Sequence, residues 1–109
     1  MSTRLHEPSF LILTALASGP QHGYEVMKNV DPISDGQVTM RVGTFYGALD
    51  QLASTGLVEV DHEEIVDSQL RRYYRLTEAG RQWLRAEAER TRAQAQTALL
   101  RLGATGALA

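Results

Sequence analysis

The longest helical pattern in this sequence lies in its last third, and it is long for a protein of 109 residues. Thr77 can cap such a helix, Glu78 complements the positive end of the helix dipole, and no proline interrupts the pattern before Gly103. Small or apolar residues recur along it in steps of 4, 3, 4, 3 and 4, at Leu84, Ala88, Thr91, Ala95, Ala98 and Leu102. This spacing permits coiled-coil packing, in which alanines let two backbones approach closely.

The size of the chain makes a partner for this helix expected. A single domain of this length has a modest core, which a second subunit can extend. The sequence therefore predicts a homodimer formed through residues 77–102, with an interface at Trp83, Leu84, Ala88, Ala95, Leu99 and Leu102. The alternative is a helix that folds back on its own domain. Residues 103–109, GATGALA, are predicted to form a flexible tail.

Three shorter helices and two strands are predicted before the long helix. Helical patterns cover about 8–17, 22–30 and 42–54, with Pro8 in the first turn of the first one and Asp31-Pro32 at the end of the second. Residues 33–40 are predicted to be a loop that can hold a short strand at 38–40. Strands at 57–60 and 70–76, joined by the polar stretch 61–69, indicate a hairpin with a long tip.

This order of elements is the plan of a winged helix-turn-helix. The predicted fold class is mainly α with a small β-hairpin, with a DNA-binding domain at 1–76 followed by the long dimerisation helix. In the third helix, Phe45, Leu49 and Leu52 recur at i, i+4 and i+7 and predict one buried face. The tyrosine at 46 and the glycines at 43 and 47 lie beside that face, where they are available for a function outside the core.

Three segments of the chain resemble the PadR family of bacterial transcriptional regulators. They are HGYE at 22–25, GTFYGALDQLASTGLVE at 43–59 and RRYYRLTEAG at 71–80, in the family's order and spacing. The resemblance covers residues 5 to about 100. It implies a winged-helix DNA-binding domain and one C-terminal dimerisation helix, acting as a repressor that a small molecule releases. Relatives often have Ser-Pro where this chain has Arg41-Val42, so the third helix is expected to start without that cap.

The candidate contacts with double-stranded DNA follow from how such domains bind. The first residues of the second helix of a helix-turn-helix enter the major groove, where side chains read base edges and other groups contact phosphates. Thr44 and Gln51 are the candidates for base contacts, and the Tyr46 hydroxyl is a candidate phosphate donor. The full predicted set is Tyr24, Arg41, Gly43, Thr44, Tyr46, Gly47, Gln51, Arg71, Arg72 and Tyr73. The alternatives are that Tyr46 covers the edge of the core and that Gly47 is a tolerated helix defect.

The charge distribution argues in part against DNA. Residues 1–76 contain 6 basic and 10 acidic residues, a net charge of −4, whereas residues 77–109 contain 5 basic and 3 acidic residues, a net charge of +2. Because DNA affinity depends on neutralising phosphates, binding has to rely on a locally basic strip and a modest salt dependence is expected. The acidic balance also suits a basic protein partner, so the alternative is a winged-helix protein-interaction module that binds no DNA.

Other classes of function lack their sequence signals. There is no G-x-S-x-G, P-loop or H-E-x-x-H motif, which argues against an enzyme, and no cofactor motif was found. The cluster Asp61-His62-Glu63-Glu64 lies in a predicted loop and is not expected to bind a metal. The apolar run FLILTALA at 10–17 is too short to span a membrane and lacks the flanks of a signal peptide. The absence of cysteine fits a cytoplasmic location.

Trp83 is the only tryptophan and lies near the start of the long helix. Some relatives bind flat aromatic compounds between subunits, so the resemblance implies a site for an aromatic small-molecule effector at Trp83. The favoured alternative is that Trp83 fills the core between the first and last helices, because a buried aromatic residue needs no ligand to explain it.

Overall fold

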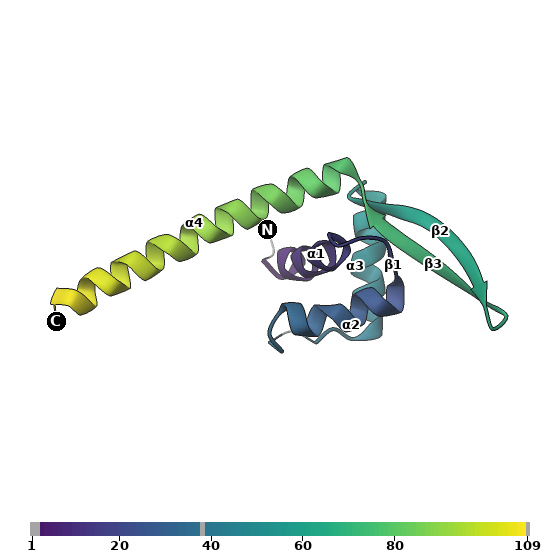
Figure 1. Cartoon of the computed structure of the whole chain (residues 1–109), viewed down its shortest axis with the longest axis horizontal. Coiled ribbons are helices and arrows are strands. Elements are labelled where there is room, and N and C mark those ends of the chain that lie inside the picture. Colours follow the sequence, from purple (N-terminus) through teal and green to yellow (C-terminus); the bar gives the residue numbers. More distant parts are fainter. Residues whose placement is uncertain (1–2, 38, 109) are drawn as a thin grey trace.

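The computed structural model describes residues 3–37 and 39–108, which form four helices and a three-stranded antiparallel sheet (Figure 1). In chain order the elements are α1 (Thr3–Leu16), β1 (Gln21–His22), α2 (Gly23–Ile33), α3 (Val42–Ser54), β2 (Val58–Val66), β3 (Gln69–Leu76) and α4 (Glu78–Leu108). The strand order is β1-β3-β2. The predicted fold class, mainly α with a small β-hairpin, is confirmed, although the two-residue strand β1 was not predicted from the sequence.

The core lies where α1, α2 and α3 meet the base of the hairpin. It contains five side chains of α1 together with buried residues of every other element except β1 and α4: Leu11, Ile12, Leu13, Ala15, Leu16, Val26, Val30, Phe45, Leu49, Leu52, Val58 and Leu76. Phe45 and Leu49 are completely buried and Leu52 is 4% exposed, which confirms the predicted buried face of α3. Trp83 and Leu84 of α4 pack against this core from outside.

The hairpin differs from the prediction in its length. The long polar tip expected at 61–69 is wrong, because β2 continues to Val66 and β3 starts at Gln69. A two-residue turn of Asp67 and Ser68, both with positive φ (53° and 63°), joins the strands, as is usual for a tight β-hairpin. Opposite charges pair across the strands, so a polar stretch that suggested a loop is a strand exposed on both faces.

The start of α1 and the end of α2 also differ from the prediction. Helix α1 begins at Thr3 rather than at Pro8, and α2 continues through Pro32 to Ile33. A proline in the last turn removes only one backbone hydrogen bond, and the amide of Ser34 still donates to the carbonyl of Val30 at 3.0 Å. Of the strand considered at 38–40, residue 38 lies outside the described residues, while Thr39 and Met40 are irregular.

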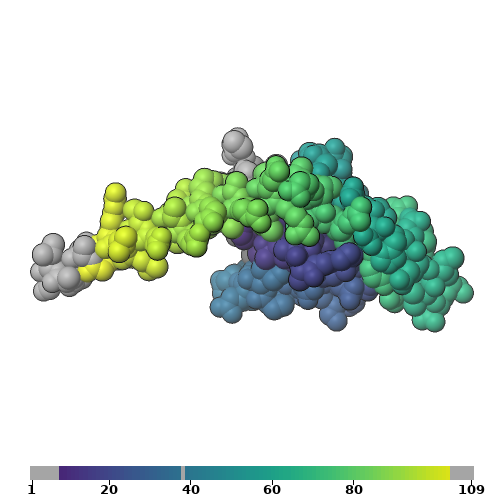
Figure 2. Space-filling model, turned by 45° about the horizontal axis from the view of Figure 1, so that its top comes forward, coloured from purple at the N-terminus to yellow at the C-terminus, as the bar shows by residue number. Residues whose placement is uncertain are grey.

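Helix α4 gives the molecule its elongated shape, with extents of 64 × 26 × 26 Å. It starts at the base of the hairpin, passes over α1 and continues beyond the domain, away from the hairpin (Figures 1 and 2). Gly103 does not end this helix, which continues to Leu108. Every residue from Ala88 to Gly103 is exposed. Among the described residues, no helix is long and apolar enough to cross a membrane.

Candidate nucleic-acid interface

The exposed start of α3 is the first part of the candidate site. Arg41 precedes the helix and makes no side-chain cap bond, as the absence of Ser-Pro predicted, although its carbonyl accepts from the Phe45 amide at 2.9 Å. Thr44 and Gln51 are exposed, and among the described residues a side-chain carbon at Gly43 or Gly47 would meet nothing within 4 Å beyond the neighbouring backbone of its own helix. This surface of α3 is therefore open to a large ligand, because no side chain projects from its two glycines.

A groove of about 500 Å³ lies between the hairpin and the starts of α2 and α3. Its lining consists of His22, Gly23, Tyr24, Tyr46, Gln69, Leu70, Arg71, Arg72 and Tyr74. Two tyrosines and two arginines that were predicted from the sequence, on α2, α3 and β3, thus meet here. The lining of the groove thus includes residues that carry phenol hydroxyls and guanidinium groups, which are typical donors to nucleic-acid phosphates.

The other predicted residues are divided between two places. Arg41, Gly43, Thr44, Gly47 and Gln51 lie at or along α3 outside the lining of the groove. Tyr73 is half-buried, and neighbouring β3 residues point to opposite faces of the sheet, so it lies on the face away from Arg72 and Tyr74.

The predicted set lacks five lining residues: His22, Gly23, Gln69, Leu70 and Tyr74. The alternation along β3 places Leu70 and Tyr74 on the same face as Arg72, and this signal was available in the sequence once the strand was known to start at Gln69. The alternation does not account for Gln69 and Arg71, which line the groove although they alternate with these residues.

Carboxylates on β2 neutralise most of the arginines of the hairpin. Arg72 Nε donates to Glu63 Oε2 at 2.9 Å, and Arg75 bridges Glu59 at 2.8 Å and Asp61 at 3.0 Å. Both arginines have their guanidinium pKa raised, chiefly by the hydrogen bonds to Glu63 and Glu59 respectively.

Arg71 lies opposite Glu64 in the ladder, yet within the described part of the chain it forms no ion pair. Its charge is therefore the most available of the three for a phosphate, even though an exposed ion pair such as that of Arg72 is weak.

A second polar cluster lies on the other face of the hairpin. His62 Nδ1 is 2.6 Å from Asp61 Oδ2, and its Nε2 is 3.1 Å from Glu64 Oε2. The imidazole stacks on Tyr73 with ring centroids 4.3 Å apart, and Tyr73 meets His22 edge-on at 5.5 Å. The hydrogen bond with Asp61 raises the pKa of His62 above its usual 6.5, and the same bond lowers the pKa of Asp61.

We expect His62 to make the hairpin more stable in mildly acidic than in alkaline solution. Because its pKa is raised in the folded state, its stabilising contribution is complete below pH 6.5 and is lost as the pH rises through the folded-state pKa. The melting temperature of His62→Gln should therefore fall below that of the wild type at about pH 5.5 and approach it at about pH 8.5. An equal difference at both pH values in circular dichroism melts would contradict this assignment.

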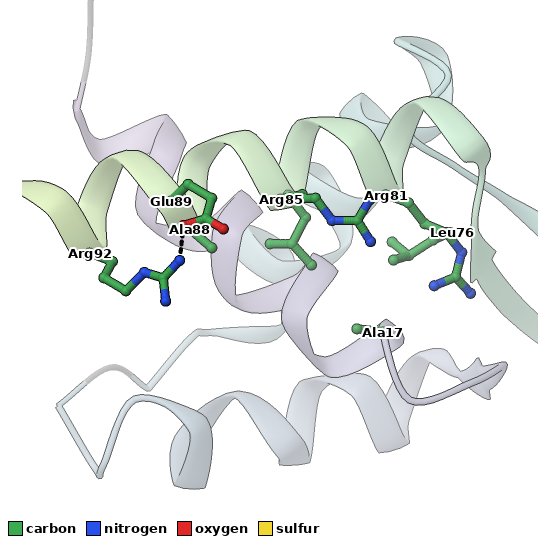
Figure 3. A pocket seen from close by; sticks show the side chains of 8 residues that line it. Ala17, Leu76, Arg81, Arg85, Ala88, Glu89 and Arg92 are labelled. Atoms are coloured by element: carbon green, nitrogen blue, oxygen red, sulfur yellow. Dashed lines mark hydrogen bonds and ion pairs between the residues drawn. The ribbon is translucent and has the colours of Figure 1, made fainter.

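A groove of about 510 Å³ runs along the other side of the molecule, between α4 and the end of α1 (Figure 3). Its lining consists of Ala17, Leu76, Arg81, Leu84, Arg85, Ala88, Glu89 and Arg92. Arg92 pairs with Glu89. Two residues of the predicted dimer interface, Leu84 and Ala88, thus contribute apolar surface to an open groove. Trp83 is half-buried against the core, which agrees with its alternative role as a core residue.

The architecture defines the class of protein. Three helices, α1 to α3, are followed by a two-stranded wing of β2 and β3, and β3 also pairs with β1. The third helix, α3, presents an open surface at its start. This architecture is a winged helix-turn-helix, in which α3 is the recognition helix. A sequence profile described as the transcriptional regulator PadR-like family matches residues 12–86. The chain belongs to this family.

Similar proteins support the fold and the family. The transcriptional regulator YqjI of Escherichia coli (strain K12) is 34% identical over 83 residues, which are 76% of this chain and 38% of that protein, so the chain spans about two fifths of the relative's length. A transcriptional regulator from Clostridium thermocellum superimposes with a TM-score of 0.72 at 24% identity, covering 88% of this chain and 94% of the other.

A third similar protein was solved together with its ligand. Bacillus subtilis PadR, in a structure with operator DNA, has a TM-score of 0.66 at 21% identity and covers 73% of this chain and 45% of the other. At this identity the likeness shows the fold alone.

Proposed function

We propose that this chain is a sequence-specific DNA-binding repressor that acts as a homodimer on an inverted repeat. The observation that supports this most is the surface formed by the open start of α3 and the groove beside it, where Tyr24, Tyr46, Arg71 and Arg72 converge. The family and the operator-bound structure of Bacillus subtilis PadR agree with it. The two-fold axis of a dimer would place half-sites about one or two turns of roughly 10 bp apart.

The geometry of the interface suggests which residues contact bases and which contact phosphates. The start of α3 enters the major groove, where Thr44 and Gln51 contact base edges. Tyr46 and Arg71 contact phosphates beside the helix, with Arg72 as a weaker contributor because Glu63 already neutralises it. The wing carries few free cations, so the number of neutralised phosphates and the dependence on salt are small.

The proposed dimer uses the exposed half of α4, residues 88–103. Leu99 and Leu102 are 68 and 69% exposed, and the groove along Leu84 and Ala88 is open. A second copy of α4 would cover these leucines and the groove, as the heptad-like spacing predicts. An aromatic effector beside Trp83 stays a prediction, and quenching of the tryptophan fluorescence by planar compounds would test it.

We expect substitutions at the interface to separate specificity from affinity. Gln51→Ala should reduce the preference for the selected operator over a mismatched duplex by about 1–3 kcal/mol, because a base contact is lost. Arg71→Ala should weaken binding to every duplex and lower the salt slope by about 1. Arg72→Ala should have a smaller effect than Arg71→Ala. Mobility shifts on duplexes selected from a random pool, repeated at several salt concentrations, measure all three.

The controls for this experiment also decide between DNA binding and the alternative, a protein-interaction module. Gln82→Ala, an exposed glutamine on α4 away from the stripe, should bind like the wild type. Equal losses on matched and mismatched DNA for Gln51→Ala would remove Gln51 from the base contacts. If the wild type retains no duplex from the pool or from the DNA upstream of its own gene, the DNA-binding proposal is wrong and the protein-interaction module becomes the better explanation.

A further inference from the structure

The phenol of Tyr46 lies directly over the backbone of Gly23. A side-chain carbon built on Gly23 would be 2.9 Å from Tyr46 Oη, 3.0 Å from Cε1 and 3.3 Å from Cζ. Real side-chain carbons do not approach other atoms so closely, so any residue other than glycine at 23 has to displace the phenol. Gly23 is the first residue of α2 and does not have a positive φ, and the backbone conformation therefore does not require glycine here. The reason for glycine is the space that the phenol occupies.

The position of Gly23 is itself fixed from two directions. The preceding residue, His22, pairs with Tyr73 of the wing and meets its ring edge-on. His22 also forms a capping box with Glu25, in which the amide of each residue donates to the side chain of the other, at 3.2 and 3.4 Å. The segment that contacts the Tyr46 phenol is thus attached both to the wing and to α2, and it does not adjust freely.

The phenol is also held from its other side. The buried ring of Phe45 meets the ring of Tyr46 edge-on, with centroids 4.9 Å apart and an interplanar angle of 80°. Tyr46 remains 39% exposed, and it lines the same groove as Arg71 and Arg72. Its hydroxyl therefore has a defined place in the groove, between the recognition helix and the wing.

We propose that Gly23 is a positioning residue of the DNA interface, which holds the Tyr46 hydroxyl where it donates to a phosphate. This inference rests on the proposed function and assigns to Gly23 a role that acts through Tyr46. A phosphate bound by Tyr46 from α3 and by an arginine of the wing would fix the angle at which α3 enters the major groove, because both elements contact it.

Gly23→Ala tests this role because it should weaken binding without weakening the fold. The three atoms nearest to the new methyl group all belong to the far end of the Tyr46 side chain, which can rotate away, and alanine is favoured over glycine in a helix. We expect an unchanged or higher melting temperature and binding weakened by about tenfold, the loss expected for one hydrogen bond to a charged oxygen. Tyr46→Phe should show the same loss. The salt slope should not change, because the hydroxyl is neutral.

The double variant gives the decisive comparison. In the Tyr46→Phe protein, Gly23→Ala should weaken binding no further, since both changes remove the same contact. Gly103→Ala is the matched control, because within the described part of the chain nothing beyond the helix's own backbone lies within 4 Å of that added carbon, and it should bind like the wild type. The affinities are measured on one duplex selected by the wild-type protein from a random pool.

Three results would overturn the role of Gly23. They are wild-type affinity of Gly23→Ala, an equal additional loss in the Tyr46→Phe background, and a melting temperature lowered so far that glycine is needed by the fold itself. All three are distinct from a failure of the proposed function, in which the wild-type protein retains no duplex at all.

Discussion

Gly80→Ala should destabilise the protein by at least about 3 kcal/mol, which corresponds to a fall in melting temperature of about 10 °C or more. A side-chain carbon at this position would lie 2.0 Å from the carbonyl oxygen of Leu57 and 3.0 Å from its carbonyl carbon. Both are backbone atoms, and unlike a flexible side chain they cannot move away without moving the start of β2.

The contacts around Gly80 explain why that movement is costly. The amide of Gly80 donates to Thr77 Oγ1 at 3.0 Å, which confirms the predicted cap of α4. Thr77 in turn donates its amide to the Leu57 carbonyl at 3.1 Å and its hydroxyl to the Gly56 carbonyl at 2.6 Å. The amide of Leu57 donates to Leu52 at the end of α3 at 2.9 Å. An added methyl group therefore separates α4 from the recognition helix at the point where they are joined.

Circular dichroism melts at one protein concentration measure this effect. Gly103→Ala is again the control, since its added carbon meets open space and removes a helical glycine, and it should melt at or slightly above the wild-type temperature. If Gly80→Ala melts with the wild type, α4 does not approach Leu57 as closely as described, and the junction has to be reconsidered.

The parts of the fold that follow from local periodicity could be predicted from the sequence. Phe45, Leu49 and Leu52 define the buried face of α3 by spacing alone, and Thr77 marks the start of α4. The hairpin could not be predicted as well, because its charged residues are stabilised by partners on the opposite strand, such as Glu63 with Arg72. Strand β1 has only two residues and forms because β3 is beside it, which no local pattern records.

In the candidate site too, the types of residue could be predicted from the sequence, whereas their contacts with distant partners could not. The types of residue on α3 and on the wing were enough to select Tyr46, Arg71 and Arg72, which do meet at one groove. Their unequal availability depends on register, because the ladder places Glu63 opposite Arg72 and the bulge between Val60 and His62 shifts that alignment. The contact between Gly23 and Tyr46 joins two different helices, so it appears only in three dimensions.

Replacing two exposed leucines near the end of α4, Leu99 and Leu102, should abolish the dimer and leave the domain folded. Both side chains are about two-thirds exposed, so Leu99→Gln and Leu102→Gln together remove no contact with the core. If a second α4 covers these two leucines, the double variant should be monomeric in light scattering at micromolar concentration. Its affinity for a two-half-site operator should fall by about 100-fold or more, since the two half-sites would no longer be bound together.

Thr97→Gln provides the matched control, because residue 97 lies on the side of α4 opposite Ala95, Leu99 and Leu102. It should remain dimeric and bind the operator like the wild type. A single half-site duplex separates association from contact with DNA, since the double leucine variant and the wild type should bind it with similar affinity. A wild-type protein that is already monomeric at micromolar concentration, or a double leucine variant that stays dimeric, would show that the exposed half of α4 is not the surface through which two copies associate.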